Sequence, residues 1–297
     1  MAPRRPRSPE VPPKLLTRRK FLKNATLTAA SSLGFAGYGF ANALDLPDVR
    51  RVDLELQALP AAWDGLRILQ ISDVHAGPYM GAERMARLRE MAMSLDPDMV
   101  VFTGDQMDRR STDAELFVRG FSGIGAPLGA WGILGNHDHF IDPERAEWAL
   151  EAAGIQPLVN RGVVLDREGS TLALVGIEDL QARKGRNPDF SVLNAFQTSF
   201  RICLCHQPQG WHRALAAGAH LTLAGHTHGG QIALTGRNLN VARFSTRYIA
   251  GPYRREESYL YVSRGVGVGA LPVRVGAPPE IDLLTLRRAA AGARAAA

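Results

Sequence analysis

Two histidines stand one residue apart in a glycine-rich stretch that follows a short apolar run. The stretch reads Ala-Gly-His-Thr-His-Gly-Gly-Gln over residues 224–231, with His226 and His228 at its centre. Imidazole is the commonest protein ligand of transition metals. The glycines would let the backbone approach a ligand more closely than a Cβ allows. A lone histidine pair is also common in surface turns, so its meaning depends on the rest of the chain.

The same kinds of side chain recur at four other places where an apolar run gives way to a loop. In open α/β sheets such strand ends are where ligands bind. Together the five places offer two carboxylates, one amide and four imidazoles, which suits a pair of divalent ions such as Mn, Fe, Zn or Co better than calcium. The residues concerned are Asp73, His75, Asp105, Asn136, His206, His226 and His228.

The elements that must position these residues alternate between apolar runs and segments of helical periodicity. Met85, Leu88, Met91 and Leu95 recur at spacings of three and four, which predicts a helix over 82–95. Strands alternating with helices indicate a layered α/β fold. Further helices are predicted at 144–153 and 211–217, and strands at 52–56, 66–71, 99–102, 131–134, 163–165, 172–177, 201–205, 259–263 and 281–286.

The net charge of +6 belongs to the beginning of the chain. Residues 1–43 hold eight Lys or Arg and one acidic residue, so the remainder carries 27 basic and 28 acidic residues. A near-neutral body lacks the basic footprint of a nucleic-acid-binding protein. We therefore expect no nucleic-acid partner, and a nuclease is disfavoured.

The basic beginning resembles a twin-arginine export signal. Thr-Arg-Arg-Lys-Phe-Leu-Lys at 17–23 precedes a weakly apolar stretch at 25–40 and the small residues Ala41-Asn42-Ala43. The resemblance implies contact with the twin-arginine export machinery and a location in the periplasm or on the outer face of the cytoplasmic membrane. A leader that is retained would anchor the protein. We expect a signal segment at 1–43, one domain at 44–288 and a frayed tail at 289–297.

The two cysteines, Cys203 and Cys205, alternate within a predicted strand. They would point to the same face, where a disulfide between them would be strained. We therefore interpret both as small core residues.

The five motifs, taken in order, resemble those of the calcineurin-like metallophosphoesterases. They are Asp73-Val74-His75, Gly104-Asp105, Gly135-Asn136-His137-Asp138, His206 and Gly225-His226-Thr227-His228. The longer form at 225–231, the His-Gln-Pro at 206–208, the Leu-Pro-Val-Arg at 271–274 and the Pro-Glu at 279–280 are similar to the bacterial exported branch. The resemblance implies a four-layer αββα sandwich with a dinuclear metal site at its strand ends.

The family's residue roles follow from the same resemblance. Two divalent metal ions would share a bridging hydroxide that attacks phosphorus, and the bridging carboxylate would be Asp105. His137 would be the catalytic residue that donates to the phosphoryl or leaving oxygen, with Asp138 orienting its ring. The resemblance assigns Asp73, His75 and His228 to one metal, and Asn136, His206 and His226 to the other.

The resemblance also implies the chemistry. The branch is similar to enzymes that cleave phosphodiester or pyrophosphate bonds of envelope lipids, including UDP-2,3-diacylglucosamine. The substrate would be a phosphorylated small molecule or a lipid, and the protein could associate with a membrane surface. A phosphomonoesterase or nucleotidase is the first alternative. A non-catalytic metal-binding envelope protein is the second, although no ligand is missing from the set.

Other charged residues have simpler expected roles. We expect Asp108 to face solvent and His139, His212 and His220 to be ordinary surface or core residues. Four arginines could bind phosphate, with the last two favoured by their position near a glycine-rich loop: Arg109, Arg110, Arg264 and Arg274.

Overall fold

The computed structural model describes residues 34, 37–234, 239–269 and 271–289. Residues 1–38 form one unit and residues 39–297 another. Most of the predicted signal segment and residues 290–297 of the predicted tail lie outside the described residues. None of the helices in the described part combines the length and apolarity needed to span a bilayer.

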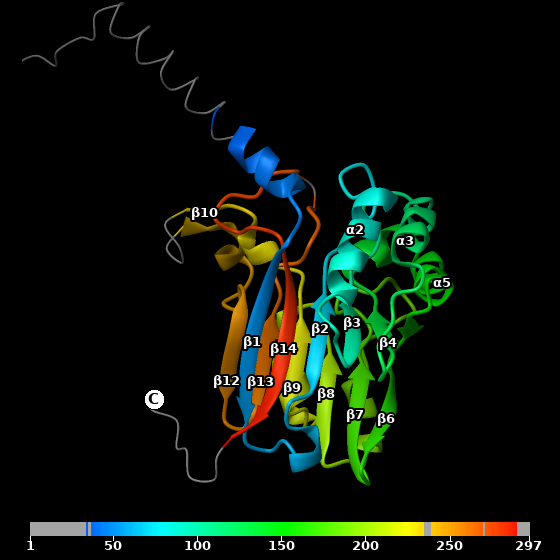
Figure 1. Ribbon diagram of the computed structural model, residues 1–297, viewed down its shortest axis with the longest axis vertical. Coiled ribbons are helices and arrows are strands. Elements are labelled where there is room, and N and C mark those ends of the chain that lie inside the picture. The colour runs from blue at the N-terminus through cyan, green and yellow to red at the C-terminus, as the bar shows by residue number, and fades with distance from the viewer. Residues whose placement is uncertain (1–33, 35–36, 235–238, 270, 290–297) are drawn as a thin grey trace, which may run out of the picture. The chain divides into compact units, whose positions relative to one another are not determined.

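The first sheet contains three of the predicted strand ends (Figure 1). Its neighbours are all parallel except the antiparallel pair of β14 and β2. In spatial order the strands are β1 (Asp48–Leu56), β14 (Glu280–Arg288), β2 (Arg67–Ile71), β3 (Met99–Thr103), β4 (Ala130–Ile133) and β5 (Gln156–Pro157).

The second sheet contains the other two strand ends. Its central strands are parallel and the two outermost pairs are antiparallel. The order is β12 (Gly251–Arg255), β13 (Ser258–Val262), β9 (Leu221–Ala224), β8 (Phe200–Leu204), β7 (Ser170–Gly176) and β6 (Arg161–Arg167). A short hairpin of β10 (Ala233–Leu234) and β11 (Leu239–Asn240) stands apart from both sheets.

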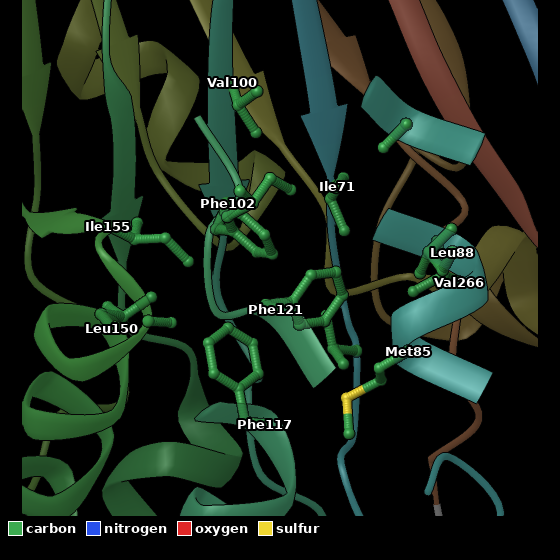
Figure 2. Close-up of a cluster of buried hydrophobic side chains, with 14 of the residues drawn as sticks. Ile71, Met85, Leu88, Val100, Phe102, Phe117, Phe121, Leu150, Ile155 and Val266 are labelled. Atoms are coloured by element: carbon green, nitrogen blue, oxygen red, sulfur yellow. The ribbon is translucent and has the colours of Figure 1, made fainter. Parts of the chain in front are cut away.

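Helices cover the outer face of the first sheet. They are α2 (Ala82–Met93), α3 (Asp113–Phe121) and α5 (Pro143–Ala153). Figure 2 shows Phe102 of β3 among Phe117 and Phe121 of α3, and the three rings pack with centroids 5.0–5.7 Å apart. As the sequence predicts, α5 begins at a proline and ends at Gly154, whose φ of 89° suits a residue without a Cβ.

Apolar side chains of the two sheets form a core between them, including Ile68 and Val101 of the first sheet and Leu174 and Ile202 of the second. The outer face of the second sheet packs against η2 (Phe190–Ala195) and α6 (Trp211–Ala216). The four-layer αββα prediction is therefore confirmed.

The predicted strands and helices all occur, with ends that differ by a few residues. The predictions omit α4 (Asn136–Ile141), strands β5 and β12, and the β10–β11 hairpin. Cys203 and Cys205 are both buried and free of disulfides, as predicted.

One polar side chain joins the two sheets beside the strand ends. Gln70 of β2 is fully buried, and its Nε2 donates to Thr103 Oγ1 (3.0 Å) and to the carbonyl oxygen of Ala224 on β9 (2.9 Å). Because a buried amide must be hydrogen-bonded, this bridge helps to fix the carboxyl ends of β2, β3 and β9 relative to one another.

Candidate metal centre

The predicted donor residues meet at the carboxyl ends of β2, β3, β4, β8 and β9. Three donor atoms, from Asp73, His75 and His228, lie within 4.8 Å of one another. His228 Nε2 is 3.1 Å from His75 Nε2 and 3.4 Å from Asp73 Oδ1. Two ligands of a tetrahedral cation with bonds of about 2.1 Å lie about 3.4 Å apart. This spacing therefore fits one cation.

Asp105 lies between that group and a second one. Its Oδ2 is 3.6 Å from His75 Nε2 and 3.3 Å from His206 Nε2. His206 Nε2 is in turn 3.2 Å from Asn136 Oδ1. A carboxylate has two oxygens with free lone pairs, so one that touches donors of both groups is placed to bridge two cations.

Among the predicted donors that could join such a group, His226 is the one whose ring nitrogens lie in none of the close groups of donor atoms in the described part of the chain. Its ring centroid is 5.1 Å from that of His206, and it joins none of the three-residue groups found among the described residues. Its amide nitrogen is nevertheless 3.0 Å from each carboxylate oxygen of Asp73. His226 is thus at the site, and its role as a ligand stays a prediction.

The chain reaches these positions in a conformation that most residues avoid. Asp73, His75, Asp105, His226 and His228 all have φ between 49° and 71°, the left-handed region. A residue with a Cβ adopts that region at a cost of about 1–2 kcal/mol. Five such residues around one cavity indicate that the backbone is shaped by the site.

Two glycines let the strand ends approach each other. A Cβ on Gly225 would lie 1.9 Å from Ser72 Oγ and 2.3 Å from Asp73 Oδ2. A Cβ on Gly135 would lie 2.2 Å from Asp105 Oδ1. Both glycines are therefore required for the two carboxylates to occupy their observed positions.

Burial leaves most of the imidazoles neutral. It lowers the pKa of His75 to about 3 and that of His226 to about 4, and it lowers the pKa of His228 well below its ordinary value. Burial also raises the pKa of Asp73 to about 6. Neutral imidazoles keep the lone pair that a metal needs.

Asp105 and His206 form a charged pair at the site. Burial alone would raise the pKa of Asp105, but the charge and hydrogen bond of His206 hold it well below the ordinary value. Asp105 raises the pKa of His206 in return, against burial. The residues fit a cation on chemical grounds too, since the buried set combines carboxylate oxygens with imidazole nitrogens, the donors that divalent transition metals take.

His137 lies at the edge of this cluster and is half-buried. Its Nδ1 is 3.2 Å from the carbonyl oxygen of Asp108, and its ring packs edge-on against His75 with centroids 4.6 Å apart. A donor bond from Nδ1 to that carbonyl leaves Nε2 for a ligand. One nitrogen of His137 also falls within 4.8 Å of donor atoms of His75 and Asp105.

The prediction that Asp138 orients His137 is wrong. Asp138 is fully buried and accepts hydrogen bonds from the backbone amides of Gly135 (2.9 Å), Gln106 (3.0 Å) and Met107 (3.0 Å). Burial raises its pKa to about 7. It therefore caps the first turn of α4 and ties that turn to the loop after β3, while a main-chain carbonyl holds His137.

Two further predictions need correction. Asp108 is buried, with Oδ1 3.7 Å from His75 Nδ1 and Oδ2 3.0 Å from Arg109 Nε. Arg274 is not available to phosphate because it is fully buried and donates to main-chain carbonyls, including those of Gly267 (3.0 Å) and Ala277 (3.2 Å). Its Nη2 also lies 3.1 Å from His228 Nδ1 and so fixes that ring.

The sequence gives no signal for a buried, hydrogen-bonded carboxylate beside the site, that of Glu178. His139 Nε2 on α4 is 2.7 Å from Glu178 Oε1, and Arg186 Nε donates to Glu178 Oε2 at 2.7 Å. Burial raises the pKa of Glu178, but these two partners hold it below its ordinary value. The contact between His139 and Glu178 fixes α4, which carries Asn136 and His137, against the loop after β7.

The close approach at Gly225 predicts the effect of adding one methyl group. Gly225→Ala should displace the Asp73 carboxylate and reduce bound metal by about tenfold or more, because a first ligand moves off its position. Gly125→Ala is the matched control, since a Cβ there meets nothing within 4 Å. Metal per folded chain after dialysis measures the effect. Equal metal content in the two variants would contradict it.

Comparison with known proteins identifies the family. The chain is 30% identical to an uncharacterised metallophosphoesterase, YkuE, of Bacillus subtilis (strain 168), over 92% of this chain and 99% of that protein. It is 28% identical to the phosphodiesterase YaeI of Escherichia coli (strain K12), over 92% and 100%. A Danio rerio protein named as a transmembrane protein with a metallophosphoesterase domain is 32% identical over 86% of this chain, which spans only 60% of that relative. The calcineurin-like phosphoesterase family profile matches residues 66–230, and the chain belongs to this family of metal-dependent phosphoesterases.

Proposed function

We propose that this protein hydrolyses phosphodiester or pyrophosphate bonds with two divalent cations. The observation that carries the proposal is the position of Asp105, whose Oδ2 lies 3.6 Å from His75 Nε2 and 3.3 Å from His206 Nε2. Asp73, His75 and His228 would hold one cation, and Asn136, His206 and His226 the other. The bound cations would supply Lewis acidity, activating water and neutralising charge on the phosphoryl oxygens.

The protein's own residues would orient the substrate and move a proton. The Asp108 carbonyl holds His137 through Nδ1, so Nε2 would face the phosphoryl or leaving oxygen. The amide nitrogen of His137 donates to Asp105 Oδ1 at 2.8 Å. His137 is therefore held at two points, by its amide on the bridging carboxylate and by its Nδ1 on a main-chain carbonyl. Both contacts favour a fixed geometry for general acid catalysis.

A groove beside the site favours a lipid or sugar-nucleotide lipid as substrate. It has a volume of about 320 Å³, and its lining includes His226, Thr227 and His228. Most of its other lining residues are apolar: Ile232, Val241, Ala242, Leu271 and Val273. Val241 and Leu271 are 56% and 64% exposed. Such a surface would bind an acyl chain while phosphorus lies at the cations.

We place this activity in the cell envelope. The proposal rests on the resemblance of residues 17–43 to a twin-arginine export signal and on the apolar groove. A substrate in the envelope would be reached from the periplasm or from the outer face of the cytoplasmic membrane.

Hydrolysis of chromogenic esters tests the reaction. Protein loaded with Mn, Fe, Zn or Co should hydrolyse bis-p-nitrophenyl phosphate faster than p-nitrophenyl phosphate, and removal of the metal should abolish both activities. Absence of turnover with all four metals would leave a non-catalytic metal-binding protein. Faster hydrolysis of the monoester would favour a phosphomonoesterase or nucleotidase.

His137→Ala tests the division between ligands and the proton donor. We expect unchanged metal content with turnover reduced by roughly 10²–10⁴-fold, the usual contribution of a general acid. His212→Ala removes an exposed imidazole on α6 and is the matched control. Loss of metal in His137→Ala would instead make His137 a ligand, as its proximity to His75 and Asp105 also allows.

The groove predicts a variant that distinguishes lipid from soluble substrates. Val241→Asp should raise KM for UDP-2,3-diacylglucosamine by about tenfold or more, since an apolar contact is lost and a charge meets the acyl chain. It should leave hydrolysis of bis-p-nitrophenyl phosphate unchanged. Val164→Asp is the control, because Val164 is 48% exposed on β6 and does not line the groove. Equal KM values in the two variants would exclude the groove as a lipid site.

A further inference from the structure

A second cavity, separate from the apolar groove, is lined by four arginines. It has a volume of about 350 Å³, and no acidic residue is among the described residues that line it. We call it the arginine pocket, after Arg50, Arg243, Arg247 and Arg264. Its volume falls in the range of about 300–1,000 Å³ that is typical of small-molecule sites.

Two of the four arginines are held by a buried carboxylate. Arg264 Nη1 is 3.1 Å and Arg50 Nη1 is 3.5 Å from Oε2 of Glu280, which is 1% exposed. The other oxygen of Glu280 accepts from the Arg264 amide at 2.9 Å. Glu280 therefore orients both guanidinium groups. Asp282 is the other buried carboxylate near Arg50.

The other two arginines are not held by any carboxylate of the described residues. Arg243 and Arg247 are exposed, and within the described part of the chain their side chains form no ion pair. The pocket therefore has an excess of positive charge. Guanidinium groups that converge in this way match the oxygens of phosphate esters, which they bind through paired N–H donors.

The pocket is built onto the turn that carries His228. Asn240 Nδ2 donates to the carbonyl oxygen of Gly229 (2.7 Å), and its Oδ1 accepts from the Ala242 amide (2.9 Å) at the start of η5 (Val241–Phe244). Gly229 lines the pocket, and a Cβ there would lie 2.9 Å from Arg264 Cγ. The pocket therefore shares one wall with the metal centre, although none of the predicted metal ligands lines it.

The short helix η5 has two chemical faces. Arg243 lines the arginine pocket, whereas Val241 and Ala242 line the apolar groove. Phe244 is 95% exposed and Val241 56% exposed. Basic and apolar side chains on one exposed segment suit an amphiphile whose charged end is a phosphate.

We propose that the arginine pocket is a second binding site, for a phosphate-bearing anion that is not at the metal centre. The chemistry is that of a phosphate mono- or diester, which either an anionic lipid headgroup or free phosphate could supply. The exposed Val241 and Phe244 favour the headgroup. This site is independent of the proposed hydrolysis, since its occupation requires no reaction at the cations.

Calorimetric titration of the full, metal-loaded chain tests the site. The probes are dihexanoyl phosphatidylglycerol, dihexanoyl phosphatidylcholine and inorganic phosphate, each used as a monomer in solution. We expect phosphatidylglycerol to bind more tightly than phosphatidylcholine, and its Kd to rise about tenfold or more in Arg243→Gln/Arg247→Gln. The single variant Arg247→Gln should show a smaller rise.

The control removes the same charge elsewhere. Arg254→Gln/Arg255→Gln alters two exposed arginines of β12 that do not line the pocket, and it should leave the Kd unchanged. If phosphate binds as tightly as phosphatidylglycerol and loses affinity in the same variants, the site is supported with free phosphate as its ligand. Equal Kd values in wild type and Arg243→Gln/Arg247→Gln, or an equal loss in the control, would overturn the proposal.

Discussion

The buried carboxylate of Asp105 is the charge on which the whole site depends. It is 2% exposed, and the surrounding histidines hold its pKa well below the ordinary value although burial opposes this. An ionised carboxylate in the interior is costly unless positive charge lies beside it. Among the protein's own groups the partner is His206, whose pKa is correspondingly raised. Two cations flanking Asp105 would supply that charge and leave His206 neutral to act as a ligand.

The geometry of the strand ends follows from this requirement. The seven predicted donors, at the ends of five strands, can meet only if the loops turn back sharply, and the left-handed φ values of Asp73, Asp105 and His228 are the result. Gln70 joins the two sheets, Asp138 ties α4 to the loop after β3, and Arg274 fixes the ring of His228. These buried polar groups thus hold the strand ends and the side chains of the site in position.

That the predicted donors lie together can be inferred from the sequence because they follow apolar strands directly. The type of residue and its place after a strand are local properties, and parallel strands bring their ends to one edge of a sheet. The alternation of strands and helices along the sequence does not fix the order of the layers, and the family resemblance supplies that order. The helix α4 is missed because its six residues overlap the metal-binding motif and lack a readable apolar period.

What the sequence does not predict depends on side-chain direction in three dimensions. Asp138 points to backbone amides rather than to its neighbour His137, and Asp108 is buried rather than exposed. Arg274, which is expected to bind phosphate because it lies near a glycine-rich loop, instead donates to main-chain carbonyls. The arginine pocket draws on residues as far apart as Arg50 and Arg264, so no short motif reveals it.

Anomalous X-ray diffraction from crystals grown with manganese tests whether Asp105 bridges two cations. We expect two anomalous peaks about 3.5–4 Å apart, one on each side of the Asp105 carboxylate. One peak should lie among Asp73, His75 and His228, and the other beside Asn136 and His206. A single peak at full metal loading, or two peaks without Asp105 between them, would contradict this expectation.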